Sequence, residues 1–120
     1  MSASHYKLDN LCIVIDNNGL QIDGNIRDVM SPYPIVDKLV AFGFHVITID
    51  GHDFDQIEAA FAEAKTISGQ PCSIFMNTVK GTGVSFMENN AGWHGKATNP
   101  AEYEIASAEL KAALAELEGK

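Results

Sequence analysis

The chain has 120 residues, of which 46% are hydrophobic and 20% are charged, as in a folded globular domain and not in a disordered segment. Its 8 basic and 16 acidic residues give a formal net charge of −8, which argues against nucleic acid or an anionic membrane as the partner. No apolar run approaches the roughly 20 residues of a membrane span, and the N-terminus has no apolar signal-peptide core. We therefore expect a single cytoplasmic domain over residues 1–120.

Strand-like and helix-like patterns alternate along the first half of the chain. Residues 11–15 form a continuous apolar run of strand length, which is typical of a strand buried on both faces. A helix is expected within 31–43, where Pro34 suits the first turn and Gly43 the position after the last turn. Residues 45–49 predict a second strand. Cys12 and Cys72 lie in apolar runs without metal-binding spacing, so we expect two buried free thiols.

The second half continues the alternation. Asp53 is the expected N-cap of a second helix, with Gln56 three residues on and Gly69 as its terminator. A third strand is expected over 72–79, a glycine-rich stretch without regular period follows it, and residues 101–120 predict an amphipathic helix. This order is typical of right-handed βαβ units on a parallel sheet, so the fold class is α/β. Three strands make a thin sheet, as if the first βα units of the fold were missing.

Ligands of such sheets bind at the carboxyl ends of the strands, and the first of these ends carries an asparagine-rich turn. Asn18-Gly19 is a strong turn signal by itself, although a tight hairpin is not expected after a parallel strand. A calcium loop counted from Asp16 fails, because Gln21 stands where glycine is required and Arg27 where glutamate is required. Magnesium needs fewer protein oxygens, and an Asn18 amide oxygen beside a backbone carbonyl suits it.

Two further candidates follow the third strand. Lys80 precedes two closely spaced glycines, a pattern that suits a phosphate, but a flexible surface loop explains it equally well. His94, between Trp93 and a glycine, is the best acid–base candidate among the four histidines, with a solvated loop histidine as the alternative. Trp93 is interpreted as a ligand wall in preference to core filler. His52, beside the Asp53 cap, is assigned a structural role first.

Taken together, these motifs resemble the transketolase family over essentially the full chain, and more narrowly the N-terminal subunit of its bacterial two-subunit (split) form. The stretches that carry the resemblance are "HYKLDNLCIVIDNNGLQIDG", "IDGHDFDQIEAAFAEAK", "TVKGTGVSFMENNAGWHGK" and the closing helix. The family's thiamine-diphosphate motif begins with Gly-Asp-Gly and ends in a strand followed by Asn-Asn, which Asn17-Asn18 matches. The Gly-Asp-Gly half is absent, so the resemblance implies the incomplete C-terminal half of a thiamine-diphosphate-binding fold.

The resemblance also implies roles for individual residues. Asn18 is implied to bind Mg²⁺ through its side-chain oxygen and Leu20 through its backbone carbonyl, with the metal holding the cofactor's diphosphate. Ile22 matches an apolar residue near the thiazolium ring, and Lys80 matches a loop residue near the diphosphate whose type varies in the family. His94 matches a histidine that contacts cofactor phosphate and substrate, which makes it the implied catalytic residue.

The function implied by the resemblance is part of a transketolase of the pentose phosphate pathway. Such an enzyme moves a two-carbon ketol unit from a ketose phosphate to an aldose phosphate with thiamine diphosphate and Mg²⁺. The implied partners are a complementary C-terminal subunit, a second copy of the assembly and sugar phosphates, with neither nucleic acid nor membrane.

Two alternatives stay open. One is a non-catalytic truncated module or interaction fragment of the same family that lacks activity by itself. The other is an unrelated nucleotide-binding α/β protein, which the missing glycine fingerprint weakens. Because the leading βα units are absent, we also expect the chain to expose an apolar sheet edge and to associate.

Overall fold

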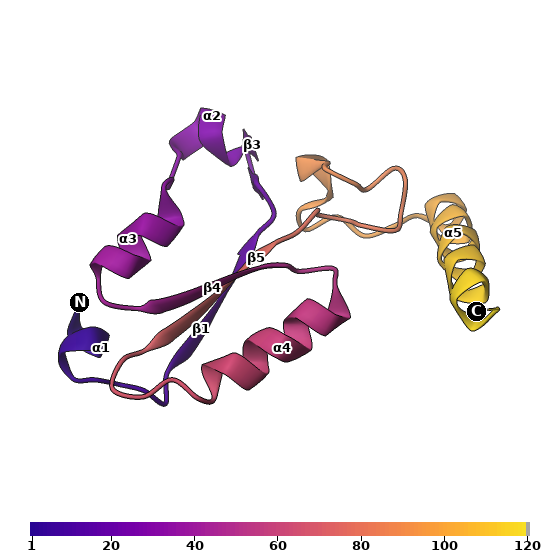
Figure 1. Ribbon diagram of the computed structural model, residues 1–120. Helices are drawn as coiled ribbons and strands as arrows, with labels where there is room; N and C mark the ends of the chain where they lie inside the picture. Colours follow the sequence, from indigo (N-terminus) through magenta and orange to yellow (C-terminus); the bar gives the residue numbers. More distant parts are fainter. Residues whose placement is uncertain (120) are drawn as a thin grey trace. The chain divides into compact units, whose positions relative to one another are not determined.

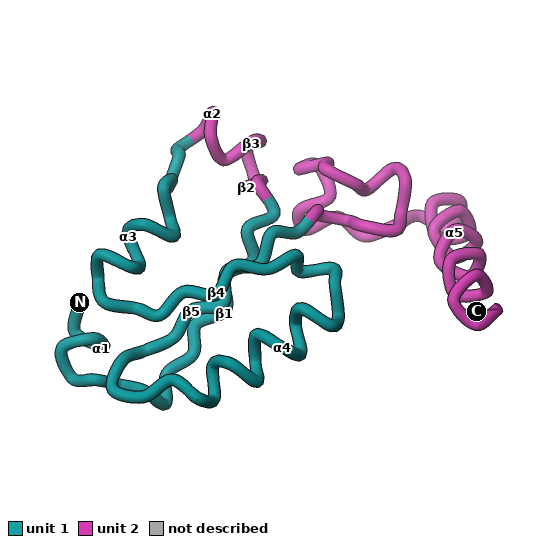
Figure 2. The backbone as a smooth tube through the Cα atoms, viewed as in Figure 1, with its two compact units in different colours: residues 1–18, 30–78 teal, residues 19–29, 79–120 magenta. Residues whose placement is uncertain are grey.

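The structure, a computed structural model, describes residues 1–119 and divides the chain into two compact units. Unit 1 consists of Met1–Asn18 and Met30–Thr78, and unit 2 consists of Gly19–Val29 and Val79–Lys120 (Figure 2). Unit 1 contains the main sheet and most of the buried apolar residues. Unit 2 contains a short hairpin, a folded loop and the final helix.

The main sheet has three parallel strands, β1 (Cys12–Asn17), β4 (His45–Asp50) and β5 (Cys72–Asn77), in the order β1-β5-β4 (Figure 1). The predicted α/β fold with a parallel sheet is confirmed. In the register of the sheet, Asn17 lies opposite Asn77, which lies opposite Asp50. The carboxyl ends of all three strands therefore meet at one edge.

Three helices accompany the sheet in unit 1: α1 (Ser2–His5), α3 (Ile35–Ala41) and α4 (Phe54–Ala64). The chain crosses from β1 past β5 to β4 through α3, and returns to β5 through α4. Right-handed crossovers in opposite directions place their helices on opposite faces of a sheet, and α3 and α4 lie on opposite sides of the strands in Figure 1. Between α4 and the sheet lies the core cluster, formed by Ile47, Ile49, Ile57, Ala60, Ala64, Ile74 and Met76.

The predicted cap of α4 is confirmed. The Asp53 carboxylate accepts hydrogen bonds from the backbone amides of Asp55 (3.0 Å) and Gln56 (3.1 Å), and the Gln56 side-chain amide donates to it at 2.7 Å. These bonds, those from Gln56 foremost, hold the pKa of the Asp53 carboxyl below its usual range. The charged cap also faces the positive end of the helix dipole.

The helix ends differ in how well the sequence predicted them. Gly43 follows the C-cap of α3 with φ +83°, as expected. The prediction that Gly69 terminates α4 is wrong, because the helix ends at Ala64 and Gly69 lies in a later turn. Thr66 explains the early end, since its amide and its hydroxyl both donate to the Glu63 carbonyl, at 2.8 and 2.7 Å.

The first strand differs from its prediction. β1 runs to Asn17, and it is an edge strand whose residues alternate between exposed and half-buried, so the expectation of burial on both faces is wrong. For the same reason the expected pair of buried thiols holds only for Cys72, whereas Cys12 is exposed. Val14 also remains exposed on this strand.

Unit 2 begins with an antiparallel hairpin of β2 (Leu20–Gln21) and β3 (Gly24–Asn25), which the sequence analysis did not predict. The helix α2 (Ile26–Met30) follows it, and its last residue, Met30, belongs to unit 1. The later part of the unit contains the 3₁₀ turn η1 (Ala91–Trp93) and the predicted C-terminal helix α5 (Pro100–Glu118). None of the helices within residues 1–119 combines the length and the apolar character that a membrane crossing requires.

Candidate functional site

The carboxyl edge of the main sheet carries a group of polar side chains, which we call the strand-end cluster. It consists of Asp16, Asn17, Asn18, Asn77 and Thr78, all in unit 1. These residues come together because β1 and β5 are parallel and in register, so that the polar residue following one apolar run lies beside the polar residue following the other. Ligands of parallel α/β sheets bind at this edge.

Asn17 fixes the geometry of the two strand ends. Its side-chain amide nitrogen donates to the Asn77 side-chain oxygen at 3.0 Å, and its own side-chain oxygen accepts from the Tyr33 hydroxyl at 2.6 Å. The Asn17 backbone oxygen accepts from the Thr78 amide at 3.4 Å. Asn17 therefore has a structural role at the end of β1, and its amide is held in one orientation.

Asp16 connects Asn18 to Thr78. One carboxylate oxygen of Asp16 accepts from the Thr78 hydroxyl, and the other accepts from the Asn18 side-chain nitrogen at 3.5 Å. This hydrogen bond turns the side-chain nitrogen of Asn18 toward Asp16, so the side-chain oxygen points away from the Asp16 carboxylate. The sequence analysis considered Asp16 only for a calcium loop and missed this positioning role. The signal for it was an acidic residue two positions before the candidate ligand.

The end of β4 approaches the same edge through a glycine. The Gly51 amide donates to the Asn77 backbone oxygen at 2.8 Å. A Cβ atom at this position would lie 2.4 Å from the Thr78 side-chain methyl carbon, so glycine permits the approach. The next residue, His52, is exposed, and its amide donates to the Asp50 carboxylate at 2.9 Å. The turn after β4 is thus stabilised by hydrogen bonds from the backbone amides of Gly51 and His52.

Leu20 and Ile22 belong to the hairpin of unit 2. Gly19 has φ +73°, and its carbonyl accepts from the Ile26 amide at 2.9 Å. This left-handed glycine is the turn that the Asn-Gly pair predicted. Leu20 lies opposite Asn25 in the hairpin, and Ile22 is at the tip with 68% of its surface exposed.

Lys80 begins a loop that closes on itself. Its carbonyl accepts from the Asn89 amide at 3.0 Å, and its side chain is half-buried. Gly81 has φ +75°, and a Cβ atom there would lie 2.6 Å from the Met87 carbonyl oxygen. The Gly83 amide donates to the Glu88 carboxylate at 3.0 Å. The glycines after Lys80 therefore serve a loop that folds back on itself over 80–89.

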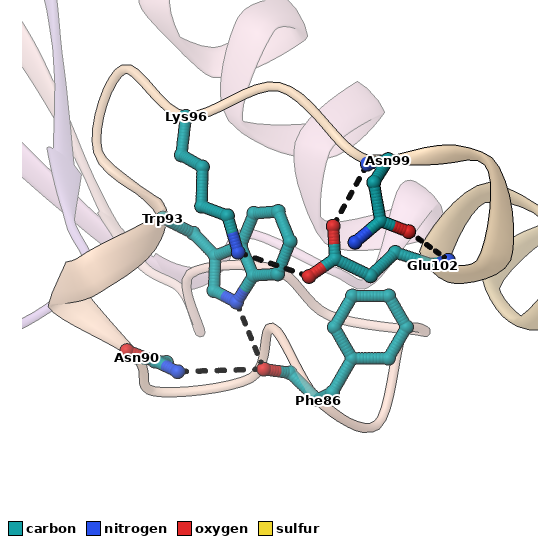
Figure 3. A network of polar contacts seen from close by, with 6 residues as sticks. All are labelled: Phe86, Asn90, Trp93, Lys96, Asn99 and Glu102. Atoms are coloured by element: carbon teal, nitrogen blue, oxygen red, sulfur yellow. Dashed lines mark hydrogen bonds and ion pairs between the residues drawn. The ribbon is translucent and has the colours of Figure 1, made fainter.

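His94 directly follows η1. Figure 3 shows the contacts of residues on either side of it in the chain. The Trp93 indole nitrogen donates to the Phe86 carbonyl at 3.0 Å, and the two aromatic rings lie 5.2 Å apart. The Lys96 ammonium lies 3.9 Å from the Trp93 ring centroid and 2.9 Å from the Glu102 carboxylate. Trp93 is thus part of the internal packing of unit 2, and His94 is exposed directly after it.

The predicted site residues fall into both units: Asn18 lies in unit 1, and Leu20, Ile22, Lys80 and His94 lie in unit 2. Across the described part of the chain, no three His, Cys, Asp or Glu side chains are grouped as a metal site. A cation bound at the strand-end cluster would therefore draw mainly on amide, carbonyl and ligand oxygens, with Asp16 as the one carboxylate of the cluster. Hard oxygen donors of this kind fit Mg²⁺, which takes few protein ligands and completes its octahedron with phosphate and water.

Comparison with known proteins gives the family. Residues 1–115 match the family described as "Transketolase, thiamine diphosphate binding domain". The chain is 40% identical over 111 residues to the 6-deoxy-6-sulfo-D-fructose transketolase subunit SqwG of Clostridium sp. (strain MSTE9), covering 92% of this chain and 40% of that protein. It is 36% identical over 118 residues to an apulose-4-phosphate transketolase subunit of Phocaeicola vulgatus, covering 98% of this chain and 42% of that protein.

The solved structures agree with this assignment. The transketolase of Campylobacter jejuni superposes on 75% of this chain and 14% of its own length, with a TM-score of 0.70 and 31% sequence identity. By the coverage of the two curated subunits above, the chain spans about two fifths of their length.

Proposed function

The chain belongs to the transketolase family, and from this premise we propose that it is part of a subunit that transfers a two-carbon ketol unit from a ketose phosphate to an aldose phosphate. The observation that carries the proposal is the family match over residues 1–115 together with Asn17-Asn18 at the carboxyl end of β1. Thiamine diphosphate supplies the carbanion chemistry when bound, and the protein supplies position and charge.

Asn18 and Leu20 are the proposed ligands of Mg²⁺. Asn18 supplies its side-chain oxygen, and the Asp16 carboxylate orients the amide through its nitrogen at 3.5 Å. Leu20 supplies its backbone carbonyl. Neither of these ligands is charged. The negative charge of the nearby Asp16 carboxylate therefore attracts the cation, and the carboxylate can also accept hydrogen bonds from water molecules bound to Mg²⁺.

The remaining site residues lie in unit 2 and act on phosphate, ring and substrate. Lys80 places a positive charge for the diphosphate, and Ile22 offers an apolar contact for the thiazolium ring. His94 donates a hydrogen bond or a proton to the oxygens of the reacting sugar. Its exposed position after Trp93 supports this role, because a substrate-facing histidine has to be accessible.

The proposed partners follow from the names of the relatives. Two of these relatives are named as subunits, which supports a complementary C-terminal subunit. We also propose a second copy of the assembly as a partner. Their named substrates are a sulfonated ketose and a phosphorylated sugar, so an anionic sugar is the proposed donor class. We also propose that the assembly is cytoplasmic.

A second candidate function is a module of the same family without activity of its own. This candidate concerns the 120 residues taken alone, which span about two fifths of the length of the curated subunits. The Gly-Asp-Gly half of the cofactor motif is also absent from the 120 residues.

Calorimetric titration of the full 120-residue chain with thiamine diphosphate in magnesium buffer separates the two candidates. We expect saturable binding that Asn18→Ala weakens at least tenfold and that requires magnesium. Gln70→Ala, in the turn before the opposite end of β5, is the matched control and should bind like the unmodified chain. Absence of heat from a chain with intact circular dichroism would overturn cofactor binding by this chain and leave the inactive module.

A further inference from the structure

The two cysteines meet at the end of the sheet opposite the strand-end cluster. Cys12 on β1 and Cys72 on β5 are register partners, and the Cys72 amide donates to the carbonyl of Leu11 at 3.0 Å. Adjacent strands lie about 4.8 Å apart, and partners in a parallel register point to the same face. That spacing falls within the range of roughly 4.4 to 6.8 Å between Cα atoms that a disulfide tolerates.

Both thiols line one cavity beneath the last turn of α4. The cavity has a volume of about 200 Å³. Its remaining walls include Leu11, Phe61, Ala64 and Lys65. Cys12 is exposed, whereas Cys72 has only 2% of its surface accessible. A small oxidant entering this cavity therefore reaches Cys12 first and finds a second thiol beside it.

Burial separates the roles of the two thiols. Burial raises the pKa of the Cys72 thiol to about 11, and the neighbouring Cys12 thiol and the Glu63 carboxylate act on it in the same direction. Cys72 is therefore a poor first nucleophile near neutral pH, since the thiolate is the reactive form. Its position beside Cys12 suits it to the second step, in which the attacking sulfur has to lie next to the oxidised one.

A soft metal ion is a weaker occupant of this position. His45 stands in register on the other side of Cys72, but its Nε2 atom lies 2.7 Å from the Glu63 carboxylate. In residues 1–119 no group of three metal-binding side chains forms, here or elsewhere. Two thiols without a third ligand favour redox chemistry over a metal.

We propose that Cys12 is an oxidation site for a small hydroperoxide and that Cys72 resolves it into a disulfide between β1 and β5. The Cys12 thiolate attacks the peroxide oxygen, the O–O bond breaks, and Cys12 becomes a sulfenic acid while the peroxide is reduced to an alcohol or water. The Cys72 sulfur then attacks the Cys12 sulfur. An S–S bond forms, the S–O bond breaks, and water leaves with the Cys72 proton.

The experiment treats the full chain with hydrogen peroxide and maps its peptides without reduction. We expect one disulfide that joins the peptides of Cys12 and Cys72 within a single chain, with loss of both free thiols. Because Cys72 has to lose its proton, closure should accelerate about tenfold per pH unit below its pKa. A sulfenic-acid trap added with the peroxide should accordingly label Cys12 more at low pH than at high pH.

Two variants distinguish the role of Cys12 from the role of Cys72. If a variant fails to fold, the peptide map of the unmodified chain still tests the proposal. Cys72→Ser should leave Cys12 as a trappable sulfenic acid, and Cys12→Ser should leave Cys72 unoxidised under the same conditions. Disulfides formed mainly between chains, or oxidation of Cys72 in the Cys12→Ser variant as fast as in the unmodified chain, would overturn the proposal. So would closure whose rate is independent of pH.

Discussion

Units 1 and 2 each contain some of the predicted site residues, and the two units are stabilised by different kinds of interaction. Unit 1 rests on a parallel backbone ladder and a core in which Ile74 has 0% of its surface exposed. Unit 2 rests on side chains that bond to loop backbone, such as Glu109 to Ser85 and Trp93 to Phe86. In α5 only Ala106 is buried, and apolar residues such as Leu110 are half exposed.

This difference indicates which of the predicted site residues are held firmly in position and which can move more easily. The backbone of a ligand at a strand end is held by the ladder, so mainly the torsions of its own side chain stay free. A ligand on a polar loop depends on bonds that water and protons can replace. Asn18 therefore belongs to the rigid part of the proposed site, and Lys80 and His94 belong to the adaptable part.

The largest effect is expected from the core of unit 1. Ile74→Ala should lower the free energy of unfolding by about 3 kcal/mol, because it removes buried methyl groups and leaves a cavity among side chains that cannot fully collapse. Urea denaturation followed by far-UV circular dichroism measures the change. This substitution tests whether the stability of the chain resides mainly in the sheet.

The matched control lies in unit 2. Ile105→Ala changes the same side chain on α5, where 51% of the isoleucine is exposed, and should cost well under about 1 kcal/mol. Equal costs for the two substitutions would break the distinction between the units. A larger cost at Ile105 would mean that the exposed face of α5 is covered by another copy of the chain in solution.

The sequence predicted those parts of the fold that are determined locally. The three parallel strands followed from apolar runs, and the cap of α4 followed from Asp53 and Gln56, which stand three residues apart. The left-handed Gly19 followed from the Asn-Gly pair. In each case the responsible residues are neighbours in the chain, so their spacing contains the signal.

What the sequence did not predict depends on partners distant in the chain. Asn17 bonds to Asn77 across a separation of 60 residues, and Asp16 bonds to Thr78 across 62. The exposure of Cys12 depends on β1 being an edge strand, which is a property of the strand order. No periodicity within one segment reports register or order, so the strand-end cluster became visible only in three dimensions.

A smaller effect is expected at the start of α5. Asn99 accepts from the Glu102 amide at 2.9 Å, and Glu102 accepts from the Asn99 amide at 2.8 Å, which completes a capping box. Asn99→Ala should cost about 1 kcal/mol and lower the helix content seen by circular dichroism. Asn99→Ser retains a capping oxygen and should recover most of the loss. If serine is as damaging as alanine, the cap is not what stabilises this end of α5.

The smallest effect concerns the acid stability of unit 2. Hydrogen bonds from the Ser85 hydroxyl and amide, at 2.5 and 2.7 Å, hold the pKa of the Glu109 carboxyl below its usual range. A carboxyl whose pKa is lower in the folded chain stabilises it above the ordinary glutamate value of about 4.3, and this contribution disappears as the pH falls through the folded pKa. Unit 2 should therefore loosen under mild acid before the apolar core of unit 1 does.

Trp93 is the single tryptophan of the chain, and its ring lies 5.2 Å from the ring of Phe86, the residue after Ser85. Its fluorescence therefore reports on this loop. We expect an acid transition below about pH 4.3, which moves to higher pH in Ser85→Ala because the carboxyl then loses its hydroxyl donor. Glu109→Gln should flatten the transition, whereas Glu116→Gln, which removes one charge further along α5, should leave it in place. A transition that survives Glu109→Gln unchanged would assign the acid sensitivity to another carboxyl, and the contrast between an apolar sheet unit and a polar loop unit would lose this support.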